Sequence, residues 1–448
     1  MSEAPESLTA GTVADRRCSR PLGLLTASRL HLYGYGVAAI YAAFLVAVYK
    51  AGSWVVDSKG VPVYSDFACA WIAGLQALQG QAGSLYDPAK FVEIQSALVG
   101  PKDYFYPNWP YPPTFFLFLA PIAALRYTYA FWAWDIITLF GCVGVVYAIV
   151  RRPAAIALVL AWPFTAWNFL AGQNGFLTAS LLGAALVLLQ RRPVLAGVFI
   201  GCLTYKPQFG VLLPVALLAA RQWRAVASAA ITTALLAGAS VAAFGSGVWA
   251  TFPRELVAQT GLYLLADADS DWGYLQTVYG LIRTLHGGAA VAWLAQGLTG
   301  LALAVVVWLL WRSQVRFSLK AATLSAAALI ATPYAFAYDM AVIAIPAAFL
   351  VSDQIRCGLL KGEQTVMVGL FAALIIGLVA LRDPPGGVTF GGIPIGPIVV
   401  VTVLGLTLRR ALRHGGSQPS LRDFPTQAAA EALCPRPDCP LPATSRSQ

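Results

Sequence analysis

Long apolar runs separated by short polar links make up most of this chain. Runs close to the ~20 residues that cross the hydrocarbon of a bilayer predict membrane spans. We place these spans at about 32–50, 113–125, 130–150, 154–170, 175–190, 194–219, 225–244, 289–311, 320–333, 338–351, 364–381 and 391–408. The pattern therefore predicts an all-α polytopic membrane protein with about twelve spans. The short runs 113–125 and 338–351 also fit tilted, broken or re-entrant segments.

Basic residues near the ends of these runs predict the orientation, because Lys and Arg favour the cytoplasmic side. Clusters precede the first span, flank the sixth, separate the eighth from the ninth and follow the last: Arg16, Arg17, Arg20, Arg29, Arg221, Arg224, Arg312, Arg316, Lys320, Arg409, Arg410 and Arg413. Both termini are then cytoplasmic, and loops 51–112 and 245–288 face out. Two pairs disagree by falling on the outer side, namely Arg151 with Arg152 and Arg191 with Arg192. Either 154–190 is a shallow hairpin that enters from outside, or these arginines meet anionic headgroups.

The first outer loop has helical periodicity but no spanning segment. From Asp66 to Gln79, apolar residues recur at steps of three and four, which indicates an amphipathic helix lying in the membrane interface. A second helix is expected after Asp87 and Pro88, which suit the N-cap and first helical positions. Asp66 lies at the N-terminal end of the first helix, where the helix dipole stabilises a carboxylate.

Composition agrees with a membrane domain over about residues 30–413. Hydrophobic residues make up 58% of the chain and charged residues only 11%, whereas about a quarter of a soluble protein is charged. Tails 1–29 and 414–448 are rich in Ser, Pro, Ala and Arg without periodicity, so we expect them to be disordered. Scattered cysteines and three histidines predict no disulfide framework, metal site or cofactor. The net charge of +10 fits anionic lipid better than nucleic acid.

Five groups of residues occur in a distinctive order and spacing. They are Ser65-Asp66-Phe67 with Trp71; Gly80 with Leu85-Tyr86-Asp87; Tyr111-Pro112-Pro113 with Pro121; Gly172-Gln173-Asn174; and Gly197 and Gly201 ahead of Lys206-Pro207, then Arg221 to Arg224. A looser sixth group is Thr332-Pro333 with Tyr338-Asp339 and Pro346. Over about residues 30 to 350, this order resembles glycosyltransferase family 87, a polytopic mannosyltransferase-like group with the C-type glycosyltransferase fold.

The resemblance implies transfer of a hexosyl, in particular a mannosyl, residue from a polyprenyl-phosphate donor. The acceptor would be a glycan or glycolipid at the outer face of the plasma membrane, and the anomeric carbon would be inverted with an outer-loop Asp as general base. Asp66 is the matching acid; from its position alone, Asp66 could equally cap a helix. Its neighbours are Ser65 and Phe67 rather than a second acid, which favours a mechanism without a metal.

Other candidate residues have competing structural explanations. Sugar contacts are expected from Tyr64, Trp71, Tyr111, Gln173, Asn174, Tyr338 and Asp339, although the aromatics also suit a membrane-interface belt. Lys206 falls deep within a predicted span, so it either pairs with Asp135 or binds the lipid phosphate. Arg151, Arg152, Arg191 and Arg192 compete for the phosphate role.

Two other classes of membrane protein fit parts of the pattern. A transporter or lipid flippase would also be polytopic, but the two halves of the chain do not repeat one another and the helical first loop has no transport rationale. A polymerase or ligase of lipid-linked glycans would share the donor type and the long outer loops.

Overall fold

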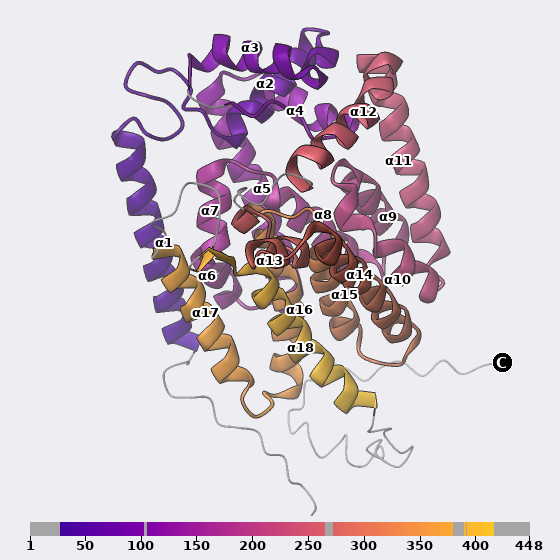
Figure 1. Cartoon of the computed structure of the whole chain (residues 1–448). Helices are drawn as coiled ribbons and strands as arrows, with labels where there is room; N and C mark the ends of the chain where they lie inside the picture. Colours follow the sequence, from indigo (N-terminus) through magenta and orange to yellow (C-terminus); the bar gives the residue numbers. More distant parts are fainter. Residues whose placement is uncertain (1–26, 103–104, 265–271, 380–388, 391, 416–448) are drawn as a thin grey trace, which may run out of the picture.

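A computed structural model describes residues 27–102, 105–264, 272–379, 389–390 and 392–415 (Figure 1). Within this part of the chain, five helices are long and apolar enough to cross a membrane, or six if one bent pair counts as a crossing. They are α1 (Ala27–Lys50), α5 (Tyr127–Val150), α11 (Trp223–Phe244), α14 (Ala289–Arg312) and the segment Ala337–Cys357, which includes the predicted span 338–351. The expected helical membrane protein is confirmed. The described helices do not support twelve simple crossings, and the disorder expected of 1–29 and 414–448 concerns residues that lie almost wholly outside the described part.

One end of the bundle, called here the α2 end, carries α2 (Asp66–Leu78), α3 (Pro88–Val99) and α12 (Ser246–Leu264), at the top of Figure 1. The two helices expected after the first span are therefore present. Asp87 caps α3 by accepting hydrogen bonds from the backbone N–H groups of Ala89 and Lys90. Helix α2 lies against α4 (Phe116–Ala123) so closely that a Cβ at Gly74 would come within 2.7 Å of the Cβ of Ala123.

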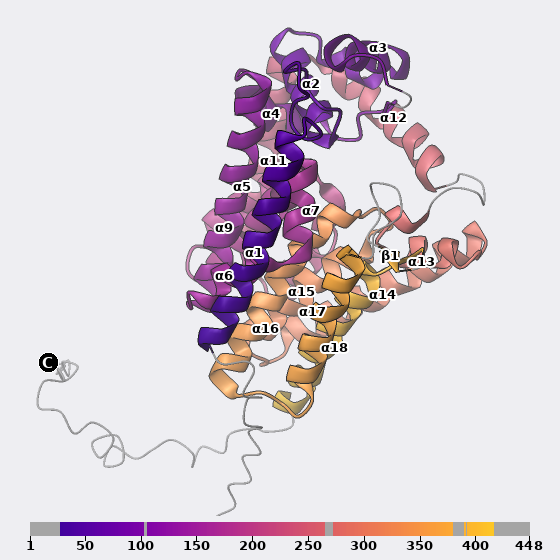
Figure 2. The same cartoon turned by 90° about the vertical axis from the view of Figure 1, so that its left-hand side faces the viewer.

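Three sets of short helices rise from the opposite end and turn back partway through the bundle (Figures 1 and 2). They are the pair α6 (Ala154–Ala161) and α7 (Pro163–Ala171), bent by 59°, with α8 (Gly175–Leu188); α9 (Pro193–Cys202) with α10 (Leu213–Ala219); and α15 (Phe317–Ala331) with α16 (Ala344–Cys357). Their turns are residues 172–174, the 3₁₀ helices η3 (Leu203–Tyr205) and η4 (Pro207–Gly210), and η6 (Ala337–Ile343). Non-helical backbone at membrane depth is tolerated only where protein buries it or a cavity hydrates it. The meeting point of these turns is therefore where a site is expected.

The placement of the arginine pairs corrects the predicted topology. Helix α4 has eight residues and is too short to cross a bilayer by itself. Residues 194–219 form two short helices with a turn at Lys206. A Cβ at Gly34 would come within 2.9 Å of Ala157, which places the start of α6 beside the first half of α1. Ser228 donates a hydrogen bond to the carbonyl of Val194, which joins the starts of α9 and α11. Arg151, Arg152, Arg191 and Arg192 therefore lie with the other basic clusters, and we name this end the arginine end.

The remaining elements complete the bundle. They are η1 (Ala82–Tyr86), η2 (Pro113–Phe115), η5 (Trp272–Tyr274), α13 (Val278–Thr284), α17 (Glu363–Val379), β1 (Thr389–Phe390), β2 (Ile393–Pro394) and α18 (Gly396–Gly415). The two strands pair antiparallel, with Thr389 opposite Pro394. At the α2 end of α18, the backbone N–H of Gly396 donates to the side chain of Gln276 at 2.7 Å.

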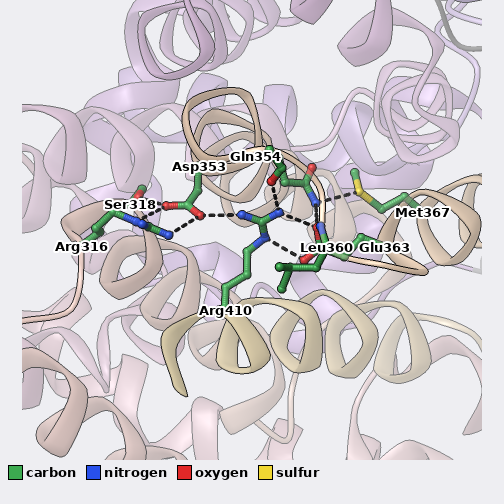
Figure 3. Close-up of polar contacts among 9 residues, drawn as sticks. Arg316, Ser318, Asp353, Gln354, Leu360, Glu363, Met367 and Arg410 are labelled. Atoms are coloured by element: carbon green, nitrogen blue, oxygen red, sulfur yellow. Dashed lines mark hydrogen bonds and ion pairs between the residues drawn. The ribbon is translucent and has the colours of Figure 1, made fainter. Parts of the chain in front are cut away.

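A buried ionic cluster holds the last four helices together at the arginine end (Figure 3). Asp353 on α16 accepts from Arg316 at 2.7 and 3.0 Å and from Arg410 at 2.9 Å. Arg410 on α18 also forms two hydrogen bonds with Glu363 at the start of α17, at 2.7 and 2.5 Å. Asp353 and Glu363 are fully buried and Arg410 is 4% exposed. Both acids are thus fully paired where an unpaired charge would be costly.

Replacing Arg410 with Met should destabilise the protein by about 3–5 kcal/mol, because it leaves the buried carboxylate of Glu363 without its cation. Thermal unfolding of the purified protein in detergent measures this. Arg409→Met is the matched control, because the one hydrogen bond of the Arg409 side chain among the described residues is to the exposed carbonyl of Lys361, and its loss should cost less than about 0.5 kcal/mol. Equal melting temperatures for the two variants would contradict the prediction.

Candidate functional site

Asp66 is the first residue of α2, but it does not cap the helix. The preceding residue, Ser65, is the N-cap, and its hydroxyl accepts from the backbone N–H of Ala68 at 3.3 Å. The carboxylate of Asp66 instead accepts hydrogen bonds from the side chains of Gln173 and Tyr106. The Asp66 carboxylate is therefore not used to cap α2, and it faces the turn between α7 and α8.

The side chain of Asn168 holds that turn in shape. Its amide nitrogen donates to the carbonyl of Gln173 at 3.0 Å, and its amide oxygen accepts from the backbone N–H of Gly175 at 2.9 Å. The side-chain oxygen of Gln173 accepts from the backbone N–H of Asn174 at 3.2 Å. Because that oxygen is engaged, the amide nitrogen of Gln173 is left to donate to Asp66.

Glycine is required on both sides of Gln173. Gly172 adopts a left-handed conformation with φ +64°, and a Cβ there would come within 2.5 Å of the Cβ of Phe67. A Cβ at Gly175 would come within 2.3 Å of the carbonyl oxygen of Tyr338. The close contacts bring α2, the α7–α8 turn and η6 to one place, which explains why glycines bracket Gln173 and Asn174.

Tyr64 supports the site indirectly, through Tyr106. The hydroxyl of Tyr64 accepts from the backbone N–H of Tyr106 at 2.6 Å and donates to Gln95 at 2.8 Å. Gln95 is fully buried and donates in turn to the carbonyl of Tyr106 at 2.8 Å. This network fixes the backbone that presents the Tyr106 side chain to Asp66.

Lys206, in the turn between α9 and α10, forms a buried ion pair with Asp339 of η6. The Lys206 Nζ atom lies 2.5 Å from Asp339 Oδ1, and the two side chains are 3% and 2% exposed. Asp339 Oδ2 accepts from the backbone N–H of Phe336 at 3.0 Å. The Lys206 ammonium also lies 4.8 Å from the ring centre of Tyr338 and 5.8 Å from that of Tyr111. One cation is thus held by a carboxylate and three aromatic rings, the third being that of Phe209 at 5.6 Å.

The expected pairing of Lys206 with Asp135 is wrong. Asp135 is fully buried on α5, and neither of its carboxylate oxygens has a partner among the described residues. Lys206 reaches Asp339 because the turn between α9 and α10 and the turn at η6 lie at the same depth in the bundle. The two partners are 133 positions apart in sequence, so local spacing gave no indication of the pair.

Burial raises the pKa of the Asp66 carboxyl above its usual value. The hydrogen bonds from Gln173 and Tyr106 and the positive charge of Lys206 oppose this rise but do not cancel it. The side chain still keeps some accessible surface. A partly accessible carboxyl with a raised pKa can take a proton more readily than an exposed one, as a general base requires.

Tyr111 and Asn174 connect the Asp66 side of the site to the Lys206 side. The Asn174 amide nitrogen donates to the Tyr111 hydroxyl at 2.7 Å, while its amide oxygen is buried without a partner among the described residues. The structure therefore brings together Asp66, Tyr111, Gln173, Asn174, Lys206, Tyr338 and Asp339 from the residues singled out by sequence. Tyr106 and Asn168 were missed; the one available signal was that Asn168 is polar in an apolar run.

Five expected residues lie elsewhere. Trp71 donates through its indole N–H to the carbonyl of Leu125 at 3.1 Å and packs α2 on the α4–α5 link. Arg151, Arg152, Arg191 and Arg192 lie at the arginine end, beyond the far ends of α5 and α8. Among the described residues, no three His, Cys, Asp or Glu side chains are grouped as metal ligands.

Comparison with known proteins identifies the family of this chain. The sequence model of glycosyltransferase family 87 matches residues 109–333, half of the chain, a range that includes Tyr111, Gln173, Asn174 and Lys206. Neither the curated proteins nor the solved structures include a significant match. The resemblance inferred from the order of the motifs is confirmed, and this chain belongs to glycosyltransferase family 87.

Proposed function

We propose that this membrane glycosyltransferase moves a hexosyl, specifically a mannosyl, residue from a polyprenyl-phosphate donor to a hydroxyl of a glycan or glycolipid acceptor. Asp66 acts as the general base. The observation that carries the proposal is the setting of Asp66: a carboxyl released from helix capping, oriented by Gln173 and Tyr106, and close enough to Lys206 for their charges to interact.

The reaction needs few protein groups. Asp66 takes the proton from the acceptor hydroxyl while that oxygen bonds to the anomeric carbon of the donor. The bond between the anomeric carbon and the phosphate oxygen breaks on the opposite face, and its electron pair leaves with the phosphate. The configuration at the anomeric carbon is inverted, and the proton remains on Asp66. Positioning of the substrates and electrostatic stabilisation of the leaving phosphate account for the rest of the rate acceleration.

Lys206 is our choice for the partner of the leaving phosphate. An ammonium group has three N–H donors, and Asp339 accepts from one of them. The others are available to phosphate oxygens, and contact with Tyr338 keeps the Lys206 side chain in place. Arg151, Arg152, Arg191 and Arg192 lie at the other end of the bundle, too far from Asp66 to serve this role. In this mechanism the sugar and the acceptor contact Tyr111, Asn174 and Tyr338.

The donor class can be tested with purified protein in nanodiscs. Radiolabelled mannose should pass to acceptor from polyprenyl-phosphate mannose and not from the matching nucleotide sugar, because the site lies among helix turns within the bundle. A diphosphate-linked oligosaccharide serves as the third donor and tests for a polymerase or ligase. Preference for the nucleotide sugar would refute the proposed donor, and transfer only from the diphosphate would favour a ligase.

We also propose that the α2 end faces outward from the plasma membrane and the arginine end faces the cytoplasm, as the positive-inside rule favours. An impermeant thiol reagent on intact cells should label Lys90→Cys, whose side chain is 65% exposed on α3, in a cysteine-free background. Arg152→Cys, exposed at the arginine end, should be labelled only after lysis. The opposite labelling pattern would place Asp66 on the cytoplasmic side.

A further inference from the structure

Gln95 is a fully buried residue of α3, the helix that lies beside α2 at the top of Figure 1. Its amide nitrogen donates to the carbonyls of Phe91 and Tyr106 at 3.1 and 2.8 Å. Its amide oxygen accepts from the hydroxyl of Tyr64 at 2.8 Å and from the thiol of Cys69 at 3.4 Å. An amide has two N–H donors and two lone pairs on its oxygen. Gln95 therefore uses all of its hydrogen-bonding capacity to join α3, α2 and the links next to them.

The backbone of Tyr106 is held at both of its polar groups by this network. Its N–H donates to the hydroxyl of Tyr64 at 2.6 Å, and its carbonyl accepts from Gln95. The rings of Tyr64 and Tyr106 also pack together, with their centres 5.9 Å apart. Because Pro107 follows, the backbone of Tyr106 is further restricted to extended conformations. These contacts fix the direction from which the Tyr106 hydroxyl reaches Asp66.

We propose that Gln95 is a positioning residue that orients the carboxylate of Asp66 through Tyr106, an inference that rests on the proposed function. Tyr106 is the last member of the network, since its side chain donates a hydrogen bond to Asp66. A general base must lie within hydrogen-bond reach of the proton that it takes. Neighbours that are themselves locked by hydrogen bonds keep a reacting group in that geometry.

The ionisation of Asp66 distinguishes a positioning role from a purely structural one. Burial raises the pKa of Asp66, and the hydrogen bonds from Gln173 and Tyr106 oppose this rise. Loss of the bond from Tyr106 removes support for the ionised form, so the pKa should rise further and the base should become active at higher pH. Four other titratable groups interact electrostatically with Asp66, namely Lys206, Cys69, Tyr111 and Tyr338. The variants that test the proposal leave all four in place.

Two single variants probe the two ends of the network. Tyr106→Phe removes the hydroxyl but keeps the ring and the backbone contacts. With polyprenyl-phosphate mannose in nanodiscs, the acid limb of its kcat/KM profile should lie about one pH unit higher than in the wild type, which is a tenfold loss below the limb. Gln95→Met removes the amide at similar side-chain size, and its limb should move in the same direction by a smaller amount.

Gln76→Met is the matched control for Gln95→Met. Gln76 is also a buried glutamine, at 6% exposure on α2, and its amide nitrogen donates to the nearby Gln79 at 3.1 Å. This variant should leave the midpoint of the acid limb unchanged. Melting temperatures of all variants are measured on the same preparations, because a purely structural defect lowers stability and the height of the profile but not its midpoint.

A double variant tests whether Gln95 acts through Tyr106. Once the Tyr106 hydroxyl is absent, Gln95→Met has no bond to Asp66 left to disturb. The acid limb of Tyr106→Phe with Gln95→Met should therefore coincide with that of Tyr106→Phe alone. Shifts that add, or a Gln95→Met variant with a lower melting temperature and an unmoved limb, would overturn the proposed role of Gln95.

The outcomes separate this inference from the proposed function. If Asp66→Asn keeps the wild-type acid limb, Asp66 is not the base and the proposed mechanism fails. If the limb depends on Asp66 but Tyr106→Phe leaves it in place, the positioning network alone is refuted. Should Gln95→Met fail to fold, Tyr64→Phe replaces it, because it removes the hydroxyl that bonds both Tyr106 and Gln95. The limb of Tyr64→Phe should then move to higher pH, and an unmoved limb would contradict the proposal.

Discussion

Replacing Asp66 with Asn is expected to lower the turnover rate by ~10²- to 10⁴-fold, the usual contribution of a general base. Asn keeps the size of the side chain and can still meet Gln173 and Tyr106, but it cannot accept the proton of the acceptor hydroxyl. Because Ser65, and not Asp66, caps α2, the variant should fold and insert normally. Turnover is measured with the polyprenyl-phosphate donor in nanodiscs, and the melting temperature confirms folding.

The pH dependence of the wild-type enzyme provides a second readout of the same group. Burial raises the pKa of Asp66, so the ionised, active form develops at higher pH than for an ordinary Asp, whose pKa is about 3.9. Activity should therefore rise with pH through that raised pKa, and the residual activity of Asp66→Asn should lack the rise. Asp87→Asn, which alters the exposed cap of α3, is the control and should keep the wild-type profile. Near-normal turnover of Asp66→Asn would exclude Asp66 as the base.

Replacing Lys206 with Met should reduce both activity and stability. The variant leaves the carboxylate of Asp339 buried without its cation, which costs about 3–5 kcal/mol. It also removes the proposed partner of the leaving phosphate, and the loss of one such preorganised charge typically lowers turnover by ~10²- to 10³-fold. Thermal unfolding and turnover are measured on the same preparation.

A double variant separates these two effects. Lys206→Met with Asp339→Asn removes both charges, so most of the lost stability should return while turnover stays low. Lys90→Met is the matched control, since the ion pair that Lys90 forms within the described part of the chain is an exposed one, with Asp87 at 3.6 Å. Recovery of full activity in the double variant would show that Lys206 is a structural partner of Asp339 and has no role at the phosphate.

Local sequence determined the parts of this protein that depend on near neighbours. The apolar runs predicted helices at nearly all of their positions, since a helix in lipid must satisfy its own backbone. Asp87 followed by Pro88 predicted the start of α3, because a cap bonds N–H groups two and three residues away. The ordered motifs were sufficient to indicate the family, and they included most of the residues that meet at the site.

Tertiary structure determined the properties that depend on contacts between residues far apart in sequence. Hydropathy does not distinguish a helix that crosses the membrane from one that turns back within it. Residues 113–125 and 194–219 were therefore counted as spans, and four arginines were placed on the opposite side of the membrane from the other basic clusters. The cation of Lys206 pairs with Asp339 because two turns from distant parts of the chain reach the same depth. Likewise, Asp66 takes part in the site only because Gln173 and Tyr106, which lie far from it in sequence, donate hydrogen bonds to it. Each of these outcomes is set by helix packing, which brings together groups whose separation in sequence carries no information about their distance in space.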